Sequence, residues 1–267
     1  MKKYNPIYYL FFILLIMGAF ASMAQNNYGI KIMGAVAIAF GFVFLVEFIT
    51  ELRKKGKKDM YALAEPLCLF ILSIVFALRV FYLRFAYVEL LFAAAALLLA
   101  LIYLRKLIQR FRQLKPKNNF LAILLFIFHL SIILFLASLA LIPFLPKISE
   151  ATGAGAFILL LIFLAAALFR RNILVDGESV SAFQMITQFK DHSIIIVSLF
   201  LLFSLYVSFT RIGVLPAIYS DEYPQAYFNL VNKAASKEEK PVDGRYKHED
   251  FMEKYQQFLK HNKVKDQ

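Results

Sequence analysis

The sequence contains no tryptophan and only one cysteine, Cys68, among its 267 residues. A single cysteine allows neither an internal disulfide nor a cysteine metal site within one chain. Motifs of the HExxH, Gly-x-Ser-x-Gly and Walker types are absent, and so is a pair of intramembrane aspartates. We therefore expect a non-enzymatic protein that holds neither a metal nor a cofactor.

Charge is also scarce, since 18% of the residues are charged and 61% are hydrophobic. The mean hydropathy is +0.65. The apolar residues form blocks of about 17 to 26 residues, the length of a transmembrane helix. The composition predicts an all-α integral membrane protein, with interfacial aromatics drawn from 14 tyrosines and 29 phenylalanines.

We expect a bundle of about seven transmembrane helices over residues 1–216. The predicted spans are about 7–24, 30–50, 66–83, 86–104, 120–145, 154–169 and 193–215. Residues 1–24 have two interpretations. They form a retained first span, or a cleaved signal peptide, because Ser22 and Ala24 are small residues at the −3 and −1 positions before Gln25. A cleaved segment would leave six spans.

Positive charge is concentrated in short segments between the apolar blocks, and the formal net charge is +12. Residues 51–59 carry five Lys or Arg, and residues 105–117 carry six. Such segments face the cytoplasm and its anionic lipids, so we expect lipid contact rather than nucleic-acid binding.

The stretch Pro66–Leu104 is nearly continuous in its apolar character. One helix of that length would measure roughly 58 Å, about twice the hydrocarbon core. Two crossings with a turn near Val80–Tyr87 place both basic segments on the same side, although no Gly, Pro or Asn marks the turn. We therefore expect a multi-pass protein of a bacterial inner membrane, with the N-terminus inside and the C-terminal tail outside.

Five ionisable residues fall within predicted spans and are candidate functional groups: Glu47, Arg79, Arg84, Glu89 and His129. Glu47 either couples an ion or reaches the basic segment that follows it. The two arginines and Glu89 either bind an anion or anchor an outer turn. His129 either relays a proton, binds a cofactor or is hydrogen-bonded to a neighbouring helix.

Small residues within predicted spans allow helices to approach closely. The candidate helix-packing positions are Gly34, Ala37, Gly41, Gly153 and Gly155. Between two spans, residues 173–180 suggest a small hairpin around Asp176 and Gly177. The segment that contains them is either a surface for a partner or a solvated linker.

The tail, residues 217–267, combines balanced charge with two amphipathic helical patterns. Its candidate partner-binding residues are Tyr223, Tyr227, Leu230, Phe251, Tyr255 and Phe258. Two helices of this size bury too little surface to be stable alone. They therefore dock on the spans, on each other or on another protein.

Two functions fit these patterns. The first is a scaffold subunit that joins other membrane or periplasmic proteins in an envelope complex through its helix faces and tail. That complex could be an ion-driven energy-transducing or transport assembly. The alternative is a small ion or small-molecule transporter or channel that uses the five intramembrane ionisable residues.

Overall fold

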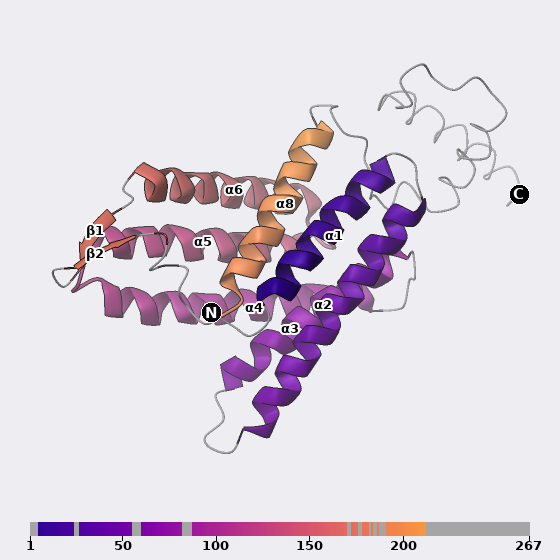
Figure 1. Ribbon diagram of the computed structural model, residues 1–267, viewed down its shortest axis with the longest axis horizontal. Helices are drawn as coiled ribbons and strands as arrows, with labels where there is room; N and C mark the ends of the chain where they lie inside the picture. The colour runs from indigo at the N-terminus through magenta and orange to yellow at the C-terminus, as the bar shows by residue number, and fades with distance from the viewer. Residues whose placement is uncertain are drawn as a thin grey trace, which may run out of the picture. The chain divides into compact units, whose positions relative to one another are not determined.

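The chain is described by a computed structural model that covers residues 5–23, 27–54, 60–81, 87–169, 172–175, 178–181, 183, 186 and 191–211. Its elements are α1 (Asn5–Met23), α2 (Asn27–Arg53), α3 (Met60–Val80), α4 (Val88–Leu114), α5 (Asn119–Leu141), α6 (Pro146–Phe169), β1 (Asn172–Val175), β2 (Glu178–Ser181) and α8 (Ser193–Arg211) (Figure 1).

Five of these helices, α2 to α6, contain segments long and apolar enough to cross a membrane. The apolar parts of α1 and α8 are shorter, at Pro6–Ala21 and Ser193–Phe209. The helices agree with the predicted α-helical, multi-pass class, and five of the seven predicted spans are long and apolar enough to cross a membrane. The predicted tail lies outside the described residues.

The stretch Pro66–Leu104 contains two helices rather than one. Helix α3 ends at Val80 and α4 begins at Val88. Tyr87 immediately precedes α4 with a φ of 66°, in the left-handed region that non-glycine residues seldom adopt. A highly exposed tyrosine thus takes the conformation that glycine usually supplies at a turn.

Several helix limits differ from the predicted spans. Helix α3 begins six residues before Pro66, and α4 continues through most of the basic segment to Leu114. Helix α6 begins at Pro146, where a proline suits the first turn. The apolar runs mark the part suited to hydrocarbon, but Lys, Arg, Gln and Leu all favour helix and extend it further.

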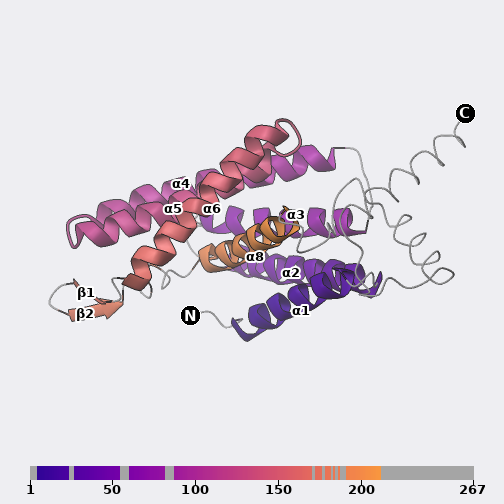
Figure 2. The same ribbon diagram turned by 90° about the horizontal axis from the view of Figure 1, so that it is seen from above.

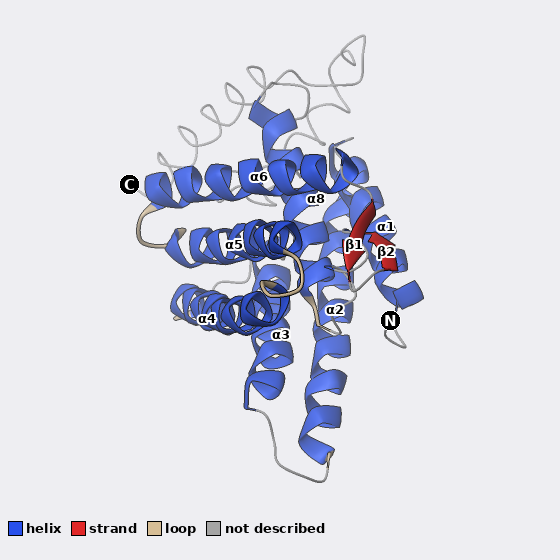
Figure 3. Cartoon of the chain, turned by 90° about the vertical axis from the view of Figure 1, so that its left-hand side faces the viewer, coloured by secondary structure: helices blue, strands red, loops and turns tan. Residues whose placement is uncertain are grey.

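The chain divides into two compact units. The first contains Gly41–Leu72 and Phe85–Leu202, and the second contains Pro6–Phe40, Ser73–Arg84 and the chain from Phe203. In the first unit, α5 lies between α4 and α6 (Figure 3). Phe128 of α5 contacts Phe163 of α6, with ring centroids 4.9 Å apart, and Phe135 stacks on Phe200 of α8 at 4.2 Å.

The second unit joins α1 to the first part of α2. The rings of Tyr8, Phe11 and Phe12 surround Phe40, with centroids 4.9 to 6.0 Å away. Close approach is also visible at Gly34. A Cβ placed there would lie 2.3 Å from the ring of Phe81, so the glycine leaves room for that ring.

The small hairpin expected after α6 is confirmed (Figure 2). Strands β1 and β2 are antiparallel, and Ile173 lies opposite Val180. Asp176 and Gly177, which were expected to form its turn, lie outside the described residues.

Candidate functional site

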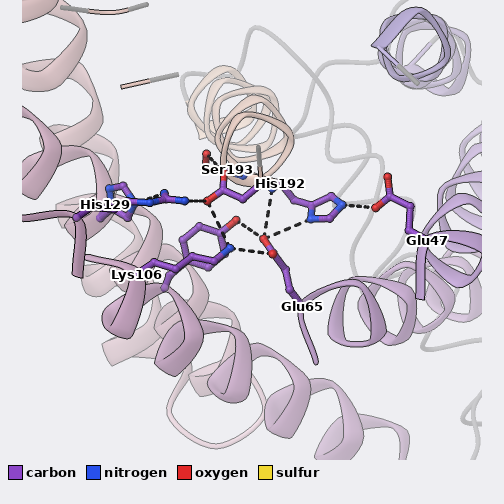
Figure 4. A network of polar contacts seen from close by, with 9 residues as sticks. Glu47, Glu65, Lys106, His129, His192 and Ser193 are labelled. Atoms are coloured by element: carbon purple, nitrogen blue, oxygen red, sulfur yellow. Dashed lines mark hydrogen bonds and ion pairs between the residues drawn. The ribbon is translucent and has the colours of Figure 1, made fainter. Parts of the chain in front are cut away.

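Polar side chains from five helices meet inside the first unit (Figure 4). We call this group the ionic cluster. Its members are Glu47 of α2, Glu65 of α3, Tyr103, Lys106 and Arg110 of α4, His129 of α5, Asp191 and His192 just before α8, and Ser193 at the start of α8.

Glu65 is the carboxylate that α3 contributes to the cluster. Its Oε1 accepts hydrogen bonds from the hydroxyl group of Tyr103, at 2.8 Å, and from the backbone N–H of His192, at 3.3 Å. Its Oε2 lies 2.8 Å from Nζ of Lys106. The side chain is 7% exposed, so these donors replace the water that a surface carboxylate would have.

The imidazole of His192 lies between two carboxylates. Nε2 is 2.5 Å from Oε2 of Glu47, and Nδ1 is 3.3 Å from Oε1 of Glu65. An ionised carboxylate only accepts hydrogen bonds, so both ring nitrogens face acceptors. An imidazolium would suit both contacts, whereas a neutral ring can donate to only one of the two carboxylates. The protonation state of His192 therefore sets the charge balance between Glu47 and Glu65.

Asp191 links α4 to the start of α8. Its Oδ2 lies 2.6 Å from Nη2 of Arg110 and 3.4 Å from Nζ of Lys106. Its Oδ1 accepts the backbone N–H and the hydroxyl of Ser193. Burial acts to raise the pKa of the Asp191 carboxyl, but the two cations outweigh burial, so the pKa lies below its ordinary value.

The hydrogen-bond partners of His129 determine which ring nitrogen carries the proton. Nη1 of Arg110 lies 2.9 Å from Nε2, and a guanidinium only donates, so Nε2 must accept. Nδ1 then carries the proton and donates to the carbonyl oxygen of Leu125 at 3.1 Å. His129 is neutral in this arrangement, and the expected hydrogen bond to a neighbouring helix is present.

Comparisons of the chain with protein-family models, with curated proteins and with solved structures give no match. Within the described part of the chain, no group of three or more His, Cys, Asp and Glu side chains is arranged to hold a metal ion. The chemistry that the cluster does offer is the binding and transfer of protons.

Two of the five predicted intramembrane residues, Glu47 and His129, belong to the ionic cluster. Glu89 lies fourteen residues before Tyr103 on α4, or about 21 Å of helix away. Arg79 lies fourteen residues after Glu65 on α3, in the second unit. Arg84 and the six candidate tail residues lie outside the described residues.

The predicted packing residues have different surroundings. Gly34 adjoins Phe81, and Ala37 and Gly41 are buried. A Cβ on Gly153 would lie 3.4 Å from the hydroxyl of Ser138, which is ordinary contact. Gly155 has no described atom within 4 Å of the Cβ position, so this site on α6 faces open space.

Most of the cluster was not singled out from the sequence. Lys106 and Arg110 belong to a basic segment that is expected to face the cytoplasm, and Glu65 lies just before the predicted span 66–83. One signal was available, because Tyr103, Lys106 and Arg110 follow the i, i+3, i+7 spacing of one helix face.

Proposed function

We propose that this multi-pass membrane protein transports protons across the bilayer, and that Glu47, His192 and Glu65 bind and release the transported proton. The observation that carries the proposal is the position of His192 between two carboxylates that come from different helices. Histidine is the side chain whose ordinary pKa lies closest to physiological pH, which suits reversible protonation.

Loss of a proton from His192 changes what holds α2 to its neighbours. With the proton present, the imidazolium attracts the Glu47 carboxylate of α2 and the Glu65 carboxylate of α3 together. Without it, one carboxylate faces a neutral ring in a region of low dielectric, where an uncompensated charge is costly. Proton binding therefore favours one arrangement of α2 relative to α3 and α8, and a proton carrier that alternates between two arrangements requires a bias of this kind.

Proton flux into liposomes tests this function. The purified chain is reconstituted with a pH-sensitive dye inside the vesicles, and a membrane potential is imposed. We expect flux from the unmodified chain and a loss of at least about tenfold in Glu47→Gln and His192→Gln, as for removal of a positioned proton-transfer group.

Glu51→Gln is the matched control, because Glu51 is on the same helix, one turn further along, and forms a surface ion pair with Lys54. It should leave the flux unchanged. Absence of flux from the unmodified chain, or equal flux in all three variants, contradicts the transport proposal.

A second candidate, a scaffold subunit of an envelope complex, is supported by α6. This helix is at the edge of the α4–α5–α6 layer, and Ile158, Leu161 and Leu168 are exposed on it. The open space at Gly155 would admit another helix. Under this proposal the chain lies in a bacterial inner membrane with its tail outside, where the tail binds a protein partner.

Mild-detergent purification from the native membrane tests the scaffold function. We expect defined partners that are lost when Gly155 is changed to leucine or when residues 217–267 are deleted. Recovery of the chain as a lone monomer in every case contradicts this second candidate.

A further inference from the structure

The exposed face of α4 changes from apolar to positively charged along the helix. Leu97, Leu101 and Leu104 are 53%, 54% and 42% exposed. On the same helical face, later in the chain, lie the exposed side chains of Arg105, Ile108, Arg112 and Lys115. A row of apolar side chains is thus followed directly by a row of cations, as expected where a helix leaves hydrocarbon and enters the headgroup layer.

The six cations of residues 105–117 divide into two groups. Lys106 and Arg110 turn inward and meet Glu65 and Asp191 in the ionic cluster. Arg105, Arg112, Lys115 and Lys117 are exposed instead. Residues 105–117 contain no Asp or Glu, so the outward face carries positive charge alone.

Arg105 is positioned by an aromatic ring. Its guanidinium carbon lies 3.6 Å from the centroid of the Tyr61 ring, at the start of α3. Stacking of this kind restrains the side chain but leaves the in-plane N–H groups able to donate. A guanidinium presented in this way matches the geometry of a phosphate, to which it donates two parallel hydrogen bonds.

We propose that this face binds an anionic phospholipid of the bilayer, with its phosphate on Arg105 and its acyl chains along Leu97, Leu101 and Leu104. Arg112 and Lys115 add attraction for the negative headgroup. A soluble anion would not use the leucines, and an acidic peptide would leave them uncovered. The exposed side chains of Ile108, Ile123 and Phe126 around the cations also suit a lipid interface.

Native mass spectrometry of the detergent-solubilised chain tests the site. Equal concentrations of phosphatidylglycerol and phosphatidylcholine are added, and bound lipids are counted. We expect preferential retention of phosphatidylglycerol, weakened about fivefold in Arg105→Gln, as for the loss of one basic residue at an anionic surface. Arg105→Lys should recover only part of the affinity, because an ammonium lacks the planar pair of donors.

Lys31→Gln is the matched control. Lys31 is an exposed cation on α2 whose Nζ also lies over a tyrosine ring, 5.4 Å from the centroid of Tyr28. Its removal should not change phosphatidylglycerol binding. An excess of soluble glycerol phosphate should not displace the lipid, because it lacks the chains that the leucines contact.

Three results would overturn the inference: equal retention of the two lipids, equal loss in Lys31→Gln and Arg105→Gln, or displacement by glycerol phosphate. A thermal melt of each variant confirms that binding is compared between folded proteins. The inference does not depend on proton transport, so failure of one proposal leaves the other standing.

Discussion

The carboxylate of Glu65 belongs to a buried network in which every charge depends on its neighbours. A buried ion pair adds little net stability over apolar packing, but removing one partner leaves the other uncompensated. Without the Glu65 charge, Lys106 would keep only the longer contact with Asp191, at 3.4 Å, and His192 would keep only Glu47. A glutamine at this position would keep an oxygen that can accept the hydrogen bond of Tyr103, so the substitution removes mainly the charge.

We therefore expect Glu65→Gln to lower the free energy of unfolding by about 3–5 kcal/mol. Glu51→Gln, which removes only a surface pair with Lys54, should cost about 0–1 kcal/mol. Thermal unfolding of the two detergent-solubilised variants, followed by circular dichroism, makes the comparison. Equal melting temperatures would show that Glu65 does not hold the cluster together.

The members of the cluster differ in how readily they can be predicted as functional residues from the sequence. Glu47 and His129 were predicted as candidates because each interrupts an apolar block, where a polar group is conspicuous. Lys106 and Arg110 were not, because cations after an apolar block are explained equally well as topology signals. Only the contacts with Glu65 and Asp191 distinguish the two roles, and those partners are 41 and 81 residues away along the chain.

At the scale of single helices, two glycines that looked alike in the sequence have different roles. The ring of Phe81 occupies the space where a side chain on Gly34 of α2 would lie, whereas Gly155 of α6 faces open space. Gly34→Ala forces the ring to move, and overpacking of this kind costs about 1–3 kcal/mol. Gly155→Ala should be neutral or slightly stabilising, because alanine favours helix.

Melting temperatures of Gly34→Ala and Gly155→Ala, measured in the same detergent, test this difference. A loss in both variants, or in neither, would mean that the contact between Gly34 and Phe81 does not limit packing in the second unit.

Helix identity was more predictable than helix length. Hydropathy located every described long helix, because twenty apolar residues have few alternatives to a membrane span. It did not locate the ends of α3, α4 and α6, which depend on helix propensity and local turns. The break before α4 was inferred only because two crossings place both basic segments on the same side of the membrane. Tyr87 itself is not a residue type that marks a left-handed turn in a sequence.

At the scale of the whole molecule, the distribution of positive charge and the order of the helices together predict the membrane topology. If α4 crosses the bilayer, Tyr87 before its start and Lys115 after its end lie on opposite sides. The basic residues around Lys115 then place that end inside by the positive-inside rule. The side on which Tyr87 lies tests whether the stretch Pro66–Leu104 crosses twice.

Cysteine labelling of the full chain measures this directly, in a Cys68→Ala background so that only the introduced thiol can react. With a membrane-impermeant maleimide on intact cells, we expect Tyr87→Cys to react at once. Lys115→Cys and Glu51→Cys should react only after permeabilisation. Reaction of Tyr87→Cys and Lys115→Cys from the same side would mean that α4 does not cross. That outcome would also remove the basis for placing residues 217–267 outside, because each crossing reverses the side of everything that follows it.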